Sequence, residues 1–136
     1  MTFVFVDAAS LIAIGDKRDR FHQQALAINE ELIKSKVKFL TTDAVVLEIA
    51  GYFSQSKRRS TAVALIETIK HSRKWKCIAV DETLMNRGLD RYRNMADKDW
   101  SLVDCISMLV AKDYGIADIF TTDHHFEQAG FVILLK

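Results

Sequence analysis

The chain of 136 residues contains no proline and only two cysteines, Cys77 and Cys105. Without proline, the helix ends depend on capping side chains and on glycines. The two cysteines have no paired spacing, so the sequence supports neither a disulfide framework nor a zinc site. Both are expected to be small buried hydrophobic side chains.

Long apolar runs are missing as well. No segment reaches the roughly 18 consecutive apolar residues of a membrane span, and the N-terminal residues have no positive flank of the kind that signal peptides carry. The sequence shows no repeat, linker or low-complexity stretch, and 49% of its residues are hydrophobic. These features predict a single domain over residues 1–136, located in the cytoplasm and without a membrane partner.

Short apolar runs alternate with helical patterns along the chain. Apolar side chains at helical spacing mark three buried helix faces, within residues 46–53, 62–69 and 102–110. The strand candidates are residues 3–6, 37–41, 77–80, 119–121 and 131–135. Because the strands lack polar alternation and are separated by helices, the sequence predicts an α/β fold, a three-layer α/β/α sandwich with a central, mostly parallel sheet.

Three acidic residues, Asp7, Glu48 and Asp104, each stand alone inside an apolar run. Burying an unpaired carboxylate costs several kcal/mol unless a partner compensates its charge, so three such cases indicate one shared partner. A divalent cation would meet that need. Asp123 is a fourth candidate, because it follows a strand and a parallel sheet delivers the carboxyl ends of its strands to one edge.

Each of these acidic residues also has a structural interpretation. Asp104 follows Ser101 by three positions, which fits a capping box, and Asp123 could cap the short helix after it. Asp7 could be a turn residue and Glu48 a solvated helix residue. The shared edge favours the joint interpretation over the separate ones. Hard oxygen ligands at that edge favour Mg²⁺ or Mn²⁺ as the cofactor.

Basic residues are concentrated in residues 54–76. This segment has seven basic side chains and one acidic side chain, a net charge of +6, whereas the whole chain carries +1. Such a flank is either a solvated helix pair or a surface that binds nucleic-acid phosphates. The candidate RNA contacts are Lys57, Arg58, Arg59, Arg73 and Lys74.

Four stretches carry a resemblance to a known family. They are Phe5-Val6-Asp7, Thr41-Thr42-Asp43 leading to Glu48, the segment 97–104, and Thr121-Thr122-Asp123-His124-His125-Phe126. With these stretches the chain resembles a PIN domain over nearly its whole length. It is similar in particular to the toxin subunit of a VapBC-type toxin–antitoxin pair.

The resemblance implies a ribonuclease whose catalytic and metal-binding residues are Asp7, Glu48, Asp104 and Asp123. In such a site, carboxylate-held Mg²⁺ or Mn²⁺ activates a water that hydrolyses the RNA phosphodiester bond. The resemblance also implies three partners: an RNA substrate, a small antitoxin protein and a second copy of the chain in a homodimer.

The sequence departs from the family pattern at Ala9, where a hydroxyl or amide side chain commonly assists the first aspartate. Other residues are therefore expected to supply hydrogen bonds around the site. Asp97 or Asp99 could add a fifth carboxylate, and His124 and His125 are assigned structural or phosphate-contact roles. The candidate supporting residues are Thr42, Asp99, Ser101 and Thr122.

Other functions remain open at this level. A dehalogenase-type phosphotransferase would need a second aspartate where Ala9 stands, and a receiver domain would need an acidic pair near the start of the chain. The stronger alternative is a noncatalytic PIN-like module that binds RNA or a protein partner. Four carboxylates argue against it, because a pure phosphate binder would gain affinity by losing them.

Overall fold

The computed structural model describes residues 2–136, which form five strands and seven helices. The strands are β1 (Phe3–Val6), β2 (Lys38–Thr42), β3 (Trp75–Ile78), β4 (Asp118–Phe120) and β5 (Val132–Ile133). The helices are α1 (Ala8–Gly15), α2 (His22–Lys34), α3 (Asp43–Tyr52), α4 (Arg59–His71), α5 (Glu82–Asn94), α6 (Leu102–Asp113) and α7 (His125–Gln128).

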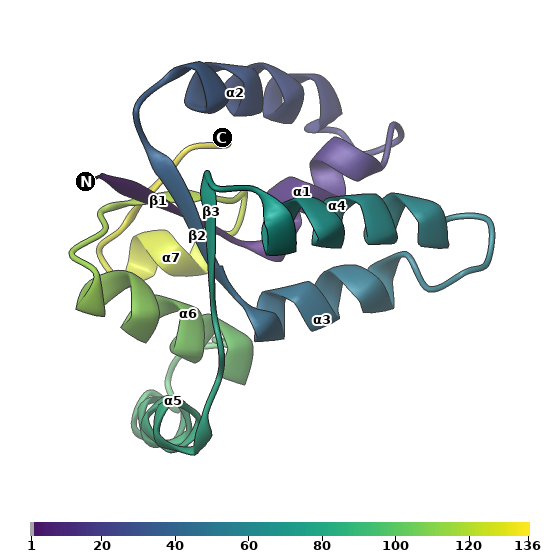
Figure 1. Cartoon of the computed structure of the whole chain (residues 1–136). Coiled ribbons are helices and arrows are strands. Elements are labelled where there is room, and N and C mark those ends of the chain that lie inside the picture. Colours follow the sequence, from purple (N-terminus) through teal and green to yellow (C-terminus); the bar gives the residue numbers. More distant parts are fainter. Residues whose placement is uncertain (1) are drawn as a thin grey trace.

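All five strands belong to one parallel sheet in the order β3-β2-β1-β4-β5. Helices α1 to α4 lie on one side of this sheet and α5 to α7 on the other (Figure 1). This arrangement confirms the predicted three-layer α/β/α sandwich. No helix within residues 2–136 has the length and apolar character needed to cross a membrane.

Strand β1 lies at the centre of the sheet, between β2 and β4. Its residue Phe5 pairs with Leu40 of β2 on one side and with Ile119 of β4 on the other, and all three side chains are fully buried. Because the strands are parallel, their carboxyl ends meet at one edge. After β1 the chain forms β2 and β3 on one side of it, and later β4 and β5 on the other side. α/β proteins bind ligands at such a switch point.

The predicted strands agree with the observed ones to within a few residues. The first matches β1, and the next three are shifted by one or two residues. Only Val132–Ile133 forms the fifth strand, within the predicted residues 131–135. Cys105 is buried as predicted, whereas Cys77 is only partly buried, on the edge strand β3.

Candidate active site

A cavity of about 460 Å³ opens beside the carboxyl ends of β1 and β4, and we name it the acidic cleft. All four acidic residues singled out from the sequence line it, although they come from four separate segments of the chain. Its lining residues are Asp7, Ala8, Ala9, Ile12, Glu48, Tyr52, Asp104 and Asp123. The parallel sheet thus brings together carboxylates that lie up to 116 positions apart in the sequence.

Asp7 is the most buried carboxylate of the cleft, with 5% of the residue exposed. It directly follows β1, and its backbone N–H donates to the carbonyl of Phe120 on β4. The Oγ1 hydroxyl of Thr121 donates to its Oδ2 at 2.8 Å, which lowers the pKa of Asp7. Burial outweighs this bond and, with the nearby charges of Asp104 and Glu48, raises the pKa of Asp7 to about 7.

Asp104 lies in the first turn of α6, where a full capping box holds it. The backbone N–H of Asp104 donates to Ser101 Oγ, and the backbone N–H of Ser101 donates to Asp104 Oδ2. Asp104 therefore caps α6 and also lines the acidic cleft. The cap uses Oδ2 alone, so the second oxygen, Oδ1, is not committed to it.

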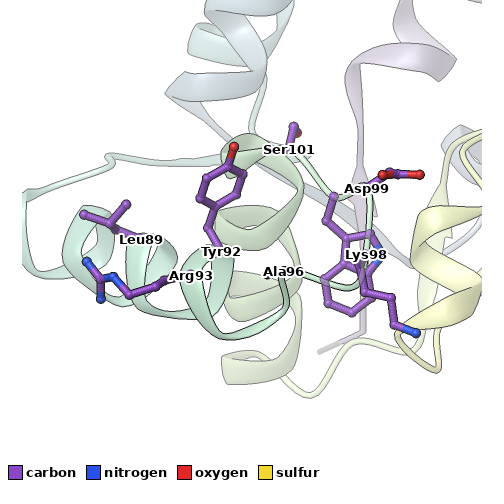
Figure 2. A pocket seen from close by; sticks show the side chains of 8 residues that line it. Leu89, Tyr92, Arg93, Ala96, Lys98, Asp99 and Ser101 are labelled. Carbon is purple, nitrogen blue, oxygen red and sulfur yellow. The ribbon is translucent and has the colours of Figure 1, made fainter.

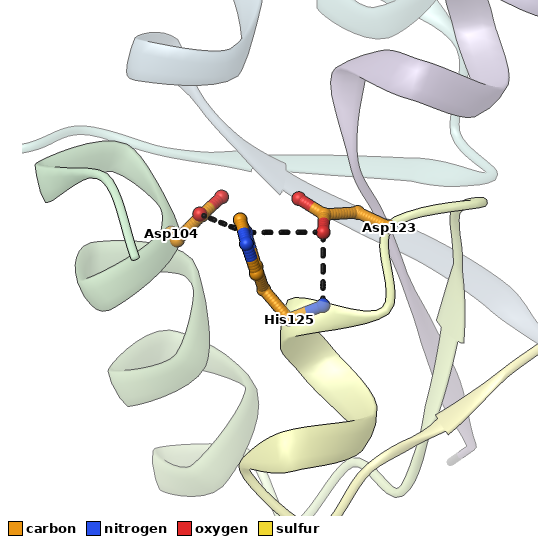
Figure 3. Close-up of side chains that lie close together, drawn as sticks. All are labelled: Asp104, Asp123 and His125. Carbon is orange, nitrogen blue, oxygen red and sulfur yellow. Dashed lines mark hydrogen bonds and ion pairs between the residues drawn. The ribbon is translucent and has the colours of Figure 1, made fainter. Parts of the chain in front are cut away.

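Asp123 and His125 face Asp104 from the start of α7 (Figure 3). The Nδ1 atom of His125 lies 3.2 Å from Asp104 Oδ2 and 3.1 Å from Asp123 Oδ1. The backbone N–H of His125 also donates to Asp123 Oδ1, so Asp123 stabilises the start of α7 with a hydrogen bond. One potential ligand atom from each of the three residues falls within 4.8 Å of the others, which is close enough for a shared ion.

Glu48 approaches the cleft from α3, which buries Val45, Val46 and Ile49 against the core. Partial desolvation raises the pKa of Glu48, and the neighbouring charges of Asp104 and Asp123 raise it further. The charge effect means that the Glu48 carboxylate lies close enough to Asp104 and Asp123 to be repelled by them. Glu48 is the most solvent-accessible of the four, at the open side of the group.

The hydrogen bonds around the cleft differ in part from those expected. Thr42 accepts the N–H of Val45 and caps α3, and the supporting hydroxyl of Asp7 is that of Thr121 instead of the predicted Thr122. Thr121 is the first residue after β4 and Thr122 is the second. In the sequence, only this position relative to the strand end distinguishes the two threonines. Near Ala9, the Ser10 hydroxyl donates to the carbonyl of Asp7.

Asp99 and Ser101 line a second cavity, of about 680 Å³, between α5 and the loop that leads into α6 (Figure 2). Neither Asp97 nor Asp99 is among the residues that line the acidic cleft. Asp97 is 71% exposed at its side chain and pairs with Lys98. His124, next to His125, is exposed and pairs with Glu127, away from the acidic group.

The predicted basic flank is divided between two ends of the molecule. Arg58 contacts the ring of Tyr52, a cleft residue, and donates to Asp16, so the segment 57–59 lies beside the cleft. Arg73 and Lys74 directly precede β3, at the opposite edge of the parallel sheet. The thirteen-residue helix α4, about 20 Å long, separates the two groups.

A parallel α/β sandwich with acidic residues gathered beyond the carboxyl ends of its central strands has the architecture of a PIN domain. Neither the comparison with protein-family models nor that with curated proteins gave a match. Comparison with solved structures did. VapC20 of Mycobacterium tuberculosis, described as a sarcin-ricin loop cleaving toxin, superposes with a TM-score of 0.86 at 23% identity, over 98% of this chain and 99% of that chain.

Two further solved structures share the fold at lower identity. VapBC2 from Rickettsia felis, solved bound to a promoter DNA fragment, gives a TM-score of 0.70 at 10% identity and covers 98% of both chains. FitAcB from Neisseria gonorrhoeae gives 0.64 at 14% identity over 96% of both. The chain therefore has the fold of VapC-type PIN domains, which confirms the fold that the resemblance implied.

Proposed function

We propose that this protein is a metal-dependent endoribonuclease that hydrolyses RNA phosphodiester bonds in the cytoplasm, as the toxin of a toxin–antitoxin pair. The observation that carries the proposal is the acidic cleft, where four carboxylates from different segments line one cavity. The shared fold with VapC20, a toxin that cleaves the sarcin-ricin loop, supports the same reaction class.

The donor set fits a divalent cation. Asp7 is buried, and its pKa is raised to about 7 by burial and by two neighbouring carboxylates, so a bound cation would stabilise its charged form. Asp104 and Asp123 would hold the ion with Asp7, and Glu48 would complete the set from α3. Carboxylate oxygens favour Mg²⁺ or Mn²⁺. When bound, such an ion polarises the scissile phosphate and lowers the pKa of an attacking water.

The chain's own side chains orient the reacting groups. The Thr121 hydroxyl fixes one oxygen of Asp7, and the capping box fixes Asp104. His125 bridges Asp104 and Asp123 and keeps these two carboxylates at a set separation. The lining of the cleft includes no serine, cysteine or lysine, so we assign its side chains to binding and orientation and the nucleophilic role to water.

The proposed protein partners are a small antitoxin and a second copy of the chain. Two solved structures with this fold carry VapBC names: VapBC2 from Rickettsia felis, and VapBC-5 from Mycobacterium tuberculosis, which is described as a member of the VapBC family of toxin–antitoxin systems. For this chain, co-expression with a small protein encoded by a neighbouring reading frame tests the antitoxin. Light scattering of the purified protein tests the dimer.

Cleavage of RNA with and without Mg²⁺ tests the reaction itself. We expect cleavage with Mg²⁺ or Mn²⁺ and none in excess chelator. Asp104→Asn should lower the rate by at least 100-fold, because the amide keeps the helix cap but removes a charged ligand. Asp97→Asn is the matched control, since Asp97 is exposed and outside the cleft, and it should cleave like the wild type.

Two outcomes would contradict the proposed reaction, and a third would change the set of ligands. Undiminished cleavage in chelator, from protein shown free of contaminating nuclease, would rule out the metal. RNA binding without cleavage under any divalent cation would favour the noncatalytic RNA-binding module. A fully active Asp104→Asn protein would leave that residue as a helix cap only and remove it from the site.

A further inference from the structure

Tyr52 lines the acidic cleft together with the four carboxylates, and the proposed reaction gives it no role. It follows Glu48 by four positions on α3, so both side chains lie on one face of the helix, about 6 Å apart along its axis. The residue is 43% exposed, whereas the next residue, Phe53, is fully buried. The cleft thus contains a half-exposed aromatic ring one helical turn from a proposed ligand.

The ring of Tyr52 is fixed at three points. Its hydroxyl donates to Oδ2 of the buried Asp16 at 2.7 Å, and the edge-to-face contact with Phe53 has a centroid distance of 4.9 Å. The Arg58 guanidinium lies over one face of the ring, 5.0 Å from its centroid, and donates to the same Asp16 oxygen, so a base would stack on the other face. A ring held in this way loses little conformational entropy when a ligand covers it.

The surroundings of the ring favour a ligand that has a flat, weakly polar group next to an anionic group. Ala8, Ala9 and Ile12 of α1 contribute apolar surface to the same cleft. The cationic side chain of Arg58 lies beside the ring. Proteins that bind single-stranded nucleic acid use this combination, in which aromatic side chains stack on bases and basic side chains follow the phosphates.

We propose that Tyr52 is a stacking platform for one nucleobase of single-stranded RNA, next to the phosphate that a metal ion at the carboxylates would hold. This inference rests on the proposed ribonuclease function and adds a binding subsite to it. Because every base has a π-face and stacking needs no hydrogen bond to a base edge, the subsite accepts any base in an unpaired strand. It positions RNA and takes no part in the chemical step.

Fluorescence of 2-aminopurine tests stacking directly, because a stacked 2-aminopurine is quenched. The probe is a set of short single-stranded RNAs with one 2-aminopurine at successive positions. They are bound to the Asp104→Asn protein with Mg²⁺ so that cleavage does not interfere. We expect one position to be quenched. Tyr52→Leu should abolish this quenching and weaken binding roughly 5- to 150-fold, the range that the loss of one stacked base gives.

Tyr52→Phe separates stacking from a structural role of the tyrosine. Both substitutions remove the hydrogen bond to Asp16, but phenylalanine keeps the ring. Stacking therefore predicts that Tyr52→Phe keeps the quenching and binds within about 2-fold of the parent, even if its melting temperature falls. Tyr114→Leu is the matched control: Tyr114 is 39% exposed, follows α6 and is not part of the cleft, so its replacement should leave RNA binding unchanged.

Three results would overturn the stacking role. They are the absence of quenching at every position, unchanged RNA affinity in Tyr52→Leu, and equal losses in Tyr52→Leu and Tyr52→Phe. Unchanged affinity would leave the exposed ring as a surface for a protein partner. A wild-type protein that binds and quenches the probe but never cleaves RNA would contradict the proposed reaction and leave the stacking subsite standing. In an active wild type, Tyr52→Leu should raise KM more than it lowers kcat.

Discussion

At the scale of single residues, the acidic cleft concentrates negative charge around Asp7. Its pKa is raised from 3.8 to about 7, chiefly by burial. In the unfolded chain this carboxyl ionises near its ordinary value, whereas in the folded chain it keeps its proton to about pH 7. The unfolded state therefore gains stability relative to the folded state as the pH rises from about 4 to 7, and above that the penalty is complete.

Asp7→Asn should remove this pH-dependent penalty. Without divalent cations at pH 8, we expect the variant to melt at or above the wild-type temperature. A relief of about 1 kcal/mol corresponds to a rise of roughly 4 °C. At pH 4 the two proteins should melt alike. Mg²⁺ should raise the melting temperature of the wild type by mass action and that of the variant much less. A variant several degrees less stable at pH 8 would show that the carboxylate is structural.

Thr121 and Thr122 allow a second comparison of single residues. The Thr121 hydroxyl donates to Asp7 Oδ2 at 2.8 Å and accepts the N–H of Asp123. Replacing it by valine keeps the shape and removes both bonds. We expect Thr121→Val to lower RNA cleavage about 10- to 100-fold, as the loss of a hydrogen bond to a metal-binding group does. Thr122→Val should cleave at the wild-type rate, and the opposite order would restore the role predicted for Thr122.

This pair of threonines shows where prediction from the sequence ends for the site. The four carboxylates could be predicted because each is isolated in an apolar run, and the parallel sheet sets their common edge. Their partners could not, because successive residues point in different directions and a strand end is known only to within a residue or two. The position of His125 between two aspartates depends likewise on the turn after β4.

At the scale of secondary structure, α5 was missed for a different reason. Apolar periodicity identifies a helix by the side chains it buries, and α5 buries only Leu84 and Gly88. Gly88 has no side chain to contribute to that pattern. It marks the closest approach of α5 to α6, because a Cβ atom there would lie 2.5 Å from Cγ1 of Ile106. The contact is invisible in the sequence because it is made by the absence of a side chain.

Gly88→Ala should therefore destabilise the fold by about 1 to 3 kcal/mol, since Ile106 is buried in the core and has little room to move. Gly51→Ala on α3 is the matched control. A Cβ atom there meets nothing within 4 Å, so alanine should stabilise the protein by about 0.5 to 1 kcal/mol through its helix propensity. Urea unfolding of the two variants measures both effects. Equal stability of Gly88→Ala and the wild type would mean that α5 shifts freely on α6.

At the scale of the whole molecule, the fold divides the basic flank that looks continuous in the sequence. The segment 57–59 lies beside the cleft through the contact of Arg58 with Tyr52. Arg73 and Lys74 lie at the amino end of β3, whereas the carboxylates lie at the carboxyl ends of the strands. An RNA strand with its scissile phosphate in the cleft can thus reach the first group more readily than the second. Arg58 itself is held by Asp16, so its neighbours in the sequence, Lys57 and Arg59, are the remaining cations of the first group.

Two double variants that remove equal charge test this division. Lys57→Gln with Arg59→Gln should weaken RNA binding. It should also make the negative slope of log affinity against log salt shallower by about 1.4, since each phosphate contact on a single strand contributes about −0.7. Arg73→Gln with Lys74→Gln should leave the slope unchanged. Cleavage at saturating RNA should be the same in both, because neither pair touches the carboxylates. Equal losses in the two variants would mean that RNA spans both ends of α4. Losses only in the second would place the strand at the amino ends of the β-strands, and the acidic cleft would then lie off its path.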